Sequence, residues 1–196
     1  MPAPGSLQGR APRSFEGREG YARAMIWVYL IGGVVVGLPL LMAIVGSLLP
    51  KGHVATRHAR FDRSRDEIWK TITDVDGFAS WRSDVKAVEL LPARDGRTSW
   101  VESGTHGKIP FEITEAIAPS RMITTIADPK LPFGGHWVYE LSENGAAATL
   151  RITENGEVYN PIFRFMSRFI FSQGATLERY LRDLGTKLGQ TVTPEP

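Results

Sequence analysis

The clearest pattern along the chain is an apolar run over residues 25–49 that contains no charged side chain, although the rest of the sequence is rich in charge. A helix over these residues reaches about 37 Å at a rise of about 1.5 Å per residue, and a hydrocarbon core is about 30 Å thick. The backbone favours a helix there because lipid offers it no hydrogen bonds. The pattern therefore predicts a transmembrane helix behind a polar leader over residues 1–24.

A cleaved signal peptide is the competing interpretation of this run, but such peptides have an apolar core of only about 7–15 residues before a small-residue cleavage site. Basic residues lie on both sides of the run, so the positive-inside rule leaves open which side of the membrane holds the rest of the chain. Gly33 and Gly37 have the GxxxG spacing that lets two membrane helices approach closely. A homodimer through these glycines is one prediction, although glycine is common in membrane helices generally.

Beyond residue 51, segments of alternating apolar and polar residues predict β-strands separated by turns. Ile109, Phe111 and Ile113 alternate with polar neighbours, which predicts a strand with one buried face. Asp95 and Gly96 form a hairpin signal. The predicted strands are antiparallel, number six or seven, and cover residues 53–61, 85–91, 98–103, 108–118, 121–127, 137–141 and 149–153.

Helical signals flank this strand region. Ser64 and Glu67 form an S-x-x-E capping box, which predicts a short helix after the first strand, and residues 74–80 are predicted to form a turn or a second short helix. Asn160 and Pro161 are a helix N-cap and a first-turn proline, and they open a long amphipathic helix that is predicted to run to residue 188. The last residues, 190–196, are predicted to form a flexible tail.

Size, charge and cysteine content narrow the classes of partner. Without the leader and the apolar run, residues 51–189 have a normal size for one domain. The leader accounts for the whole net charge of +2, so the domain is formally neutral and lacks the basic excess that nucleic-acid binding requires. The absence of cysteine excludes disulfides, thiolate metal sites and cysteine nucleophiles.

Three stretches of the sequence resemble the SRPBCC superfamily, which includes START and polyketide cyclase/dehydrase-like proteins. They are RFDRSRDEIWKTITDVDGFASWRSDVKAVELL, ADPKLPFGGHWVYEL and ITENGEVYNPIFRFMSRFIF. The resemblance covers residues 54–188 and implies an α+β helix-grip fold, in which a curved antiparallel sheet wraps around a long C-terminal helix. It is specific for the fold and not for an activity, because the superfamily hosts lipid carriers, aromatase/cyclases and quinone-binding proteins.

The resemblance also implies an apolar cavity between the sheet and the final helix, and hence a hydrophobic ligand. The residues expected to line it lie on the inward faces of the strands and of that helix. They are Phe111, Ile113, Trp137, Tyr139, Ile152, Met166, Phe169 and Ile170, with Trp81 and Trp100 closing the mouth. Plain core packing produces the same spacing, so both interpretations stay open.

The histidines offer little sign of catalysis. None lies at the spacing of a metal site or of a nucleophile motif such as HExxH or GxSxG. His53 and His58 are expected to be solvated, His106 to lie in a hairpin loop and His136 to face outward. The sequence therefore predicts no metal and no cofactor.

The carboxylates near the end of the last strand offer slightly more. Glu154 continues the inward register of that strand and Tyr159 follows at the corner before the helix, so Glu154 is a candidate acid or base facing the cavity. Asn155 and Gly156 permit a bulge that would return Glu154 to solvent, and Glu157 is an equal candidate. The pattern lacks the matching acid or base on another strand, so it favours binding over catalysis.

The sequence thus predicts a membrane-anchored domain that binds a hydrophobic small molecule, such as a lipid, a quinone or a polyketide-like compound. The anchor favours this function because it holds the cavity beside the reservoir into which apolar ligands partition. Two alternatives stay open: an enzyme of the polyketide cyclase/dehydrase type, and a membrane-tethered interaction module in which Phe163 and Phe171 dock a partner or the bilayer surface. The identity of the ligand and the side of the membrane are undetermined.

Overall fold

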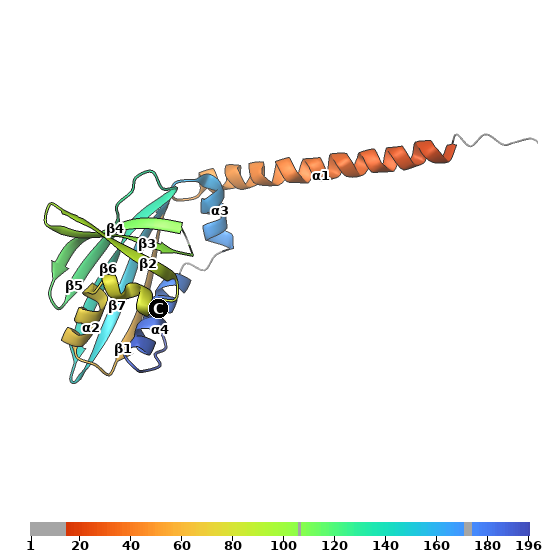
Figure 1. The fold of residues 1–196 in the computed structure, drawn as a ribbon. Helices are drawn as coiled ribbons and strands as arrows, with labels where there is room; N and C mark the ends of the chain where they lie inside the picture. The colour runs from red at the N-terminus through yellow and green to blue at the C-terminus, as the bar shows by residue number, and fades with distance from the viewer. Residues whose placement is uncertain (1–14, 106, 171–173) are drawn as a thin grey trace, which may run out of the picture.

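The computed structural model describes residues 15–105, 107–170 and 174–196. Its first element is a helix, α1 (Phe15–Leu48), which projects from the rest of the molecule (Figure 1). The part Met25–Leu48 is long and apolar enough to cross a membrane, and its most apolar stretch is not buried in the protein. A signal sequence near the N-terminus meets the same description. The helix also takes in the described part of the segment that the sequence indicates as a polar leader.

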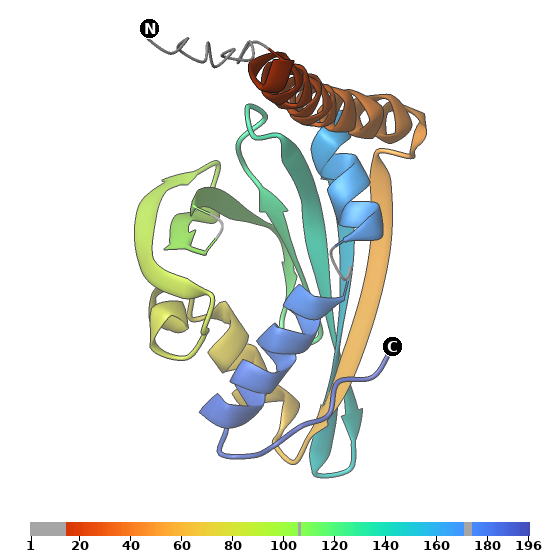
Figure 2. The ribbon, with the colours of Figure 1, turned by 90° about the vertical axis from the view of Figure 1, so that its right-hand side faces the viewer.

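The domain is built on one antiparallel sheet of seven strands in the order β1-β7-β6-β5-β4-β3-β2. The strands are β1 (Gly52–Phe61), β2 (Val85–Arg94), β3 (Arg97–Gly104), β4 (Gly107–Ile117), β5 (Arg121–Ile126), β6 (Phe133–Asn144) and β7 (Ala147–Val158). The sheet is curved, and helices lie in its concave side (Figure 2). This is the expected α+β helix-grip fold, with β1 brought beside β7 although the two strands lie at opposite ends of the domain's sequence.

Two short helices follow β1. The first, α2 (Arg65–Thr73), begins as the sequence predicts, because the Ser64 side chain accepts a hydrogen bond from the Glu67 N–H. Its apolar residues Ile68 and Ile72 are buried against the sheet. The second is the 3₁₀ helix η1 (Asp76–Ser80), which leads the chain into β2.

The C-terminal region forms two helices where the sequence predicts one. They are α3 (Pro161–Phe169), which opens with the predicted Asn160 cap, and α4 (Ala175–Lys187). Residues 171–173, between them, lie outside the described part of the chain. Gly174 directly precedes α4, and glycine is a weak helix former. The spacing of apolar residues does not reveal such a break, because the same helical spacing continues on its far side.

The core lies between the sheet and α4. Four residues of α4 share one face and are almost fully buried, namely Leu177, Tyr180, Leu181 and Leu184. They pack with inward residues of β7, including Leu150 and Ile152, in a single apolar cluster. In Figure 2, α3 and α4 lie one after the other across the face of the molecule from which α1 leaves.

The last residues, predicted to be a flexible tail, are instead held against β1. His58 and Glu195 exchange two backbone hydrogen bonds, each of 2.8 Å, which adds the tail to the outer edge of the sheet. Val192 packs against the core, and the Gln190 side chain accepts a hydrogen bond from the Asp62 N–H. The sequence did not predict this pairing, because a segment can form backbone hydrogen bonds with an edge strand without an apolar pattern of its own.

Candidate functional site

A cavity of about 570 Å³ lies inside the curve of the sheet. Its apolar walls come mainly from η1 and strands β3 to β6, and they include Phe78, Trp100, Ile109, Phe111, Ile126 and Trp137. Phe163 and Ser167 of α3 and Thr176 of α4 also line it. The volume falls in the range of about 300–1,000 Å³ that small-molecule sites occupy. The cavity is therefore large enough for a small organic ligand.

Four of the residues expected to line this cavity do so, namely Trp100, Phe111, Trp137 and Tyr139. Trp100 is almost fully buried and stacks on Phe111 at 5.7 Å between ring centroids, so it forms a wall and not a mouth. The binding role of these four side chains stays a prediction.

The other expected lining residues lie elsewhere in the fold. Ile113, Ile152 and Trp81 belong to the packed core, where Trp81 meets the edge of Tyr180 at 5.3 Å. The remaining three, Met166, Phe169 and Ile170, belong to the region of α3 and lie outside the cavity lining. The prediction placed them inside because it continued the face of α4 backwards through a break in the helix.

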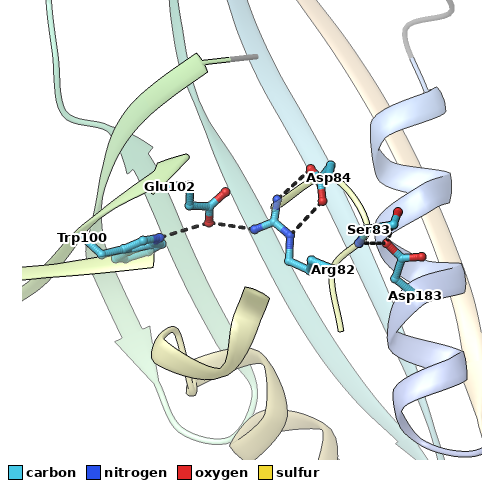
Figure 3. A network of polar contacts seen from close by, with 6 residues as sticks. All are labelled: Arg82, Ser83, Asp84, Trp100, Glu102 and Asp183. Carbon is cyan, nitrogen blue, oxygen red and sulfur yellow. Dashed lines mark hydrogen bonds and ion pairs between the residues drawn. The ribbon is translucent and has the colours of Figure 1, made fainter. Parts of the chain in front are cut away.

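One side of the cavity carries a buried polar network that the sequence pattern did not reveal. The Arg82 guanidinium lies between two carboxylates: its Nη1 donates to Glu102 Oε1 at 2.7 Å, and its Nη2 donates to Asp84 Oδ2 at 2.9 Å (Figure 3). Glu102 Oε1 also accepts the indole N–H of Trp100 at 3.0 Å. Arg82, Asp84, Trp100 and Glu102 all line the cavity.

Aromatic faces and charges together hold Arg82 in its ionised form. Its guanidinium lies 5.3 Å from the ring centre of Phe78 and 5.4 Å from that of Tyr180, within the range of cation–π contacts. Burial alone would lower the pKa of Arg82, but the carboxylates of Glu102 and Asp84 outweigh it and raise that pKa above its ordinary value. The network therefore presents a fixed positive charge flanked by two carboxylates.

The two oxygens of the Glu102 carboxylate differ in their hydrogen bonds. Within the described residues, both hydrogen bonds to the Glu102 carboxylate go to Oε1, from Arg82 and Trp100. A carboxylate accepts at both oxygens, so Oε2 keeps its acceptor capacity. The Tyr139 side chain also belongs to the cavity lining, and burial raises the pKa of its hydroxyl. The Glu102 oxygen suits a ligand with a hydroxyl or amine at one end.

A second polar group lies near the end of β7. Glu154 stands opposite Trp137 in a β6–β7 ladder that runs without a register shift, so its side chain faces the cavity as the inward register predicts. His53 Nε2 lies 3.6 Å from Glu154 Oε1. The expectation that His53 is solvated was wrong: this side chain is largely buried, lines the cavity and packs over Gly156, which has no Cβ to obstruct it.

The remaining candidates lie at the rim. Tyr159 donates its hydroxyl proton to Glu157 Oε2 at 2.8 Å, and both side chains are exposed. This hydrogen bond raises the pKa of Tyr159. Glu157 borders the cavity, as does His136, which is also exposed as expected. His106 lies outside the described residues.

Sequence reasoning missed Arg82, Asp84, Glu102 and His53. A signal was present for Glu102, because Trp100 and Glu102 are two apart on one strand and therefore share its inward face. Arg82 lies in the link between η1 and β2, where no period indicates a direction. Within the described part of the chain, no group of three or more His, Asp or Glu residues is placed to hold a metal ion.

Comparison with solved structures shows the same fold in other proteins. A START superfamily protein from Mycobacterium smegmatis has a TM-score of 0.56 at 15% identity, over 70% of this chain and 97% of that chain. The Zhui aromatase/cyclase from Streptomyces sp. R1128 has a TM-score of 0.57 at 9% identity, over 70% and 94%. A conserved protein from Geobacillus kaustophilus has 0.56 at 13% identity, over 74% and 100%.

At these identities the likeness establishes the fold alone. No protein-family model matches the sequence, and no curated protein matches it either. The chain therefore has the fold of START and aromatase/cyclase structures, and its function has to be argued from its own residues.

Proposed function

We propose that this protein is a membrane-anchored binding protein for a hydrophobic small molecule that carries a hydrogen-bond donor at one end. The observation that supports it most directly is the cavity of about 570 Å³, whose aromatic and aliphatic walls meet a small set of buried polar groups. Ligand sites commonly combine a mostly apolar lining with a few placed polar groups that fix the orientation of the ligand. A lipid, a quinol or a polyketide-like compound has this character.

The apolar helix supports the membrane part of the proposal. Anchored by Met25–Leu48, the cavity stays within tens of ångströms of the bilayer. Apolar ligands partition into that bilayer, so their concentration near the cavity is far higher than in bulk water. The sequence favours a permanent anchor over a cleaved signal because the apolar run exceeds the length of a signal-peptide core.

The Arg82–Glu102 network supports the polar end of the ligand. Glu102 Oε2 provides an acceptor in a cavity whose lining is mostly apolar. A ligand hydroxyl satisfies this acceptor, whereas a pure hydrocarbon leaves the carboxylate oxygen without a partner. We therefore expect bound molecules to contain a hydroxyl or amine group.

The first experiment asks whether the cavity holds a ligand. The full chain is purified in mild detergent and its bound molecules are identified by native mass spectrometry and lipid extraction. Ile109→Trp fills the cavity from β4, and Ile117→Trp makes the same change at an exposed position on the same strand. We expect one defined ligand in the wild type and in Ile117→Trp, and its loss in Ile109→Trp.

A second comparison tests the polar end. Glu102→Gln removes one negative charge from the cavity wall, while Glu112→Gln makes the same change on β4, where the carboxylate bonds Arg97 away from the cavity. We expect Glu102→Gln to weaken binding about tenfold, the effect of one lost charge-assisted hydrogen bond. Recovery of only non-specific detergent from every variant would remove the proposal.

An enzyme of the cyclase/dehydrase type is the second candidate, and the His53–Glu154 pair facing the cavity is the observation that favours it. Histidine and carboxylate side chains are the types that general acid–base catalysis uses. The variant Glu154→Gln with Glu157→Gln removes both carboxylate candidates. If the protein is an enzyme, the molecule trapped by this variant differs from that recovered from the wild type, by the mass of water for a dehydration or in chromatographic retention for a cyclisation; if it is a carrier, the two are identical.

A tethered interaction module is the third candidate. Phe163 is half exposed on α3, and Phe171 lies outside the described residues. Crosslinking in native membranes separates this candidate from the others, because an interaction module traps a defined protein and a ligand carrier does not.

A further inference from the structure

Helix α3 buries a charged side chain and exposes apolar ones, which is the reverse of the pattern in a water-soluble domain. Of its nine residues, only Arg164 is buried, at 6% exposure. Phe169 at its end and Ile170, the next residue, are 60% and 61% exposed, and Phe163 is 49% exposed. A helix in a soluble protein buries its apolar face and exposes its charges. Here Arg164 is inside, whereas Phe163 and Phe169 are outside.

The sequence of α3 divides cleanly into two arcs. At 100° per residue, the apolar side chains from 162 to 170 fill one continuous arc of about 160°. These side chains are Ile162, Phe163, Phe165, Met166, Phe169 and Ile170. Arg164, Ser167 and Arg168 occupy the opposite arc. Helices that lie in a membrane interface combine a large apolar arc with a polar, basic opposite face.

Arg164 joins this helix to the end of the apolar span. Its guanidinium donates to the carbonyls of Gly46 at 3.0 Å and Leu49 at 3.1 Å, at the C-terminal end of α1. It also donates to the carbonyls of Val158, the last residue of β7, and of Tyr159, which follows it. The last carbonyls of a helix have no partner within it, so one side chain satisfies the end of α1 and fixes α3 beside it.

The direction of α3 follows from this joint. In Figure 1, α1 runs across the page while α3 runs down it, on the side of the domain from which α1 leaves. The plane of a bilayer that α1 crosses is perpendicular to the axis of α1. Because α3 runs crosswise to α1 in that view, the axis of α3 lies along that plane. Lys51 is exposed and lies two residues beyond Leu49, where it suits anionic lipid headgroups.

We infer that α3 is a second membrane contact, an interfacial helix that places Phe163, Phe169 and Ile170 in the headgroup region of the bilayer that α1 crosses. Phe163 is both exposed and part of the cavity lining, so α3 forms one edge of the cavity opening. The inference rests on the proposed function in one further respect: a ligand enters past α3 directly from the lipid, without crossing water.

The position of α3 is testable by site-directed labelling, because the chain has no cysteine. Single variants Phe169→Cys and Ile170→Cys place an environment-sensitive fluorophore on the apolar arc. Arg168→Cys places it on the opposite arc of the same helix, and Leu90→Cys on an exposed apolar position of β2. Each full-length variant is reconstituted into phospholipid vesicles and quenched with either lipid-borne nitroxides or aqueous iodide.

We expect the labels at 169 and 170 to be quenched several-fold more by the lipid-borne quencher than the label at 90, because interfacial helices lie about 5–10 Å into the headgroup boundary. The label at 168 should be quenched chiefly by iodide. Labels at 169 and 170 that respond to iodide as the label at 90 does would overturn the inference. These measurements need no bound ligand, so they stand or fall separately from the proposed function.

Ligand entry is tested with paired double variants. Phe169→Glu with Ile170→Glu charges the membrane face of α3, and Leu90→Glu with Leu91→Glu does the same to an exposed apolar pair on β2. The probe is the lipid extract recovered from the wild type. We expect the α3 variant to take it up from vesicles at least tenfold more slowly, with unchanged equilibrium binding in detergent, and the β2 variant to match the wild type. Equal uptake by both variants would contradict entry past α3.

Discussion

Helices α3 and α4 follow one another along the chain and both are amphipathic, yet they turn opposite faces outward. The apolar face of α4 is closed against the sheet, with Leu177, Leu181 and Leu184 fully buried. The apolar face of α3 is open, and its one buried side chain is Arg164. An amphipathic period establishes that a helix has two faces, but the medium that covers each face depends on the neighbouring elements.

Different forces therefore hold the two helices. Each buried leucine of α4 contributes about 1.5–3 kcal/mol through removal of apolar surface from water. The described contacts of α3 are instead polar at their centre, with one guanidinium donating to four backbone carbonyls. Outside a membrane, α4 should thus be the stable helix of the pair and α3 the first to open.

The largest expected effect comes from truncating the buried face of α4. Leu181→Ala should lower the free energy of unfolding by about 3–5 kcal/mol, because it removes a fully buried side chain and leaves a hole in the core. Ile170→Ala beside α3 should change it by less than about 0.5 kcal/mol in detergent, since that side chain is exposed. Chemical denaturation of the two variants of the full chain measures both values.

The two substitutions also test which apolar face is buried, that of α3 or that of α4. Comparable losses of stability from the two substitutions would mean that the apolar side of α3 packs against protein, and the contrast between the helices would disappear.

The next effect concerns the joint between α1 and α3. Arg164→Met keeps the length of the side chain but removes all four donated hydrogen bonds, so we expect a local loss of about 2–3 kcal/mol. Hydrogen exchange should become faster in α3 and in the last turn of α1, while α4 keeps its protection. Arg164→Lys retains the charge and should recover part of the protection; faster exchange throughout the domain would instead indicate a role in the core.

A smaller effect is expected where α4 holds the segment that carries Arg82. Asp183 of α4 accepts hydrogen bonds from the Ser83 N–H and the Ser83 hydroxyl, each at 2.7 Å (Figure 3). Asp183→Asn weakens both and should cost about 1 kcal/mol of stability. Ser83→Ala removes only the hydroxyl bond and should cost less. Thermal unfolding of both variants distinguishes these values, and equal losses would show that the backbone bond contributes nothing.

Much of the fold was predictable because its signals are local and periodic. The alternation of Ile109, Phe111 and Ile113 predicts β4, and the capping box at Ser64 predicts the start of α2. The pairing of β1 with β7 is not local, and no pattern in the two strands indicates it. The split between α3 and α4 was missed because Gly174 interrupts the helix without disturbing the spacing of its apolar residues.

The candidate site was less predictable for a physical reason. Trp137 and Glu154 lie on strands, where the inward direction follows from a period of two. Arg82 lies in a link without a period, and its burial depends on Glu102, Asp84 and the rings of Phe78 and Tyr180, which come from other elements. Only the assembled fold brings these partners together.

The smallest expected effect lies at the start of α4, where Glu178 connects that helix to β1. Its carboxylate accepts hydrogen bonds from Arg57 and Arg182, each at 3.0 Å. The hydrogen bond from Arg57 lowers the pKa of Glu178 below its ordinary value of 4.5, with Arg182 adding to the shift. The charged form therefore stabilises the folded state, and no corresponding ion pair holds α3 among the described residues.

Because the folded-state pKa of Glu178 is lowered, its contribution to stability is fully present above about pH 4.5 and is lost as the pH falls through the lowered value. We expect Glu178→Gln to reduce stability by less than about 1 kcal/mol at pH 7, since the pair is partly solvated. The difference from the wild type should shrink below pH 4 and at high salt. Denaturation of both proteins between pH 3 and 7 checks this. A difference that stays constant over that range would show that the carboxylate acts by packing against β1 and not by its charge.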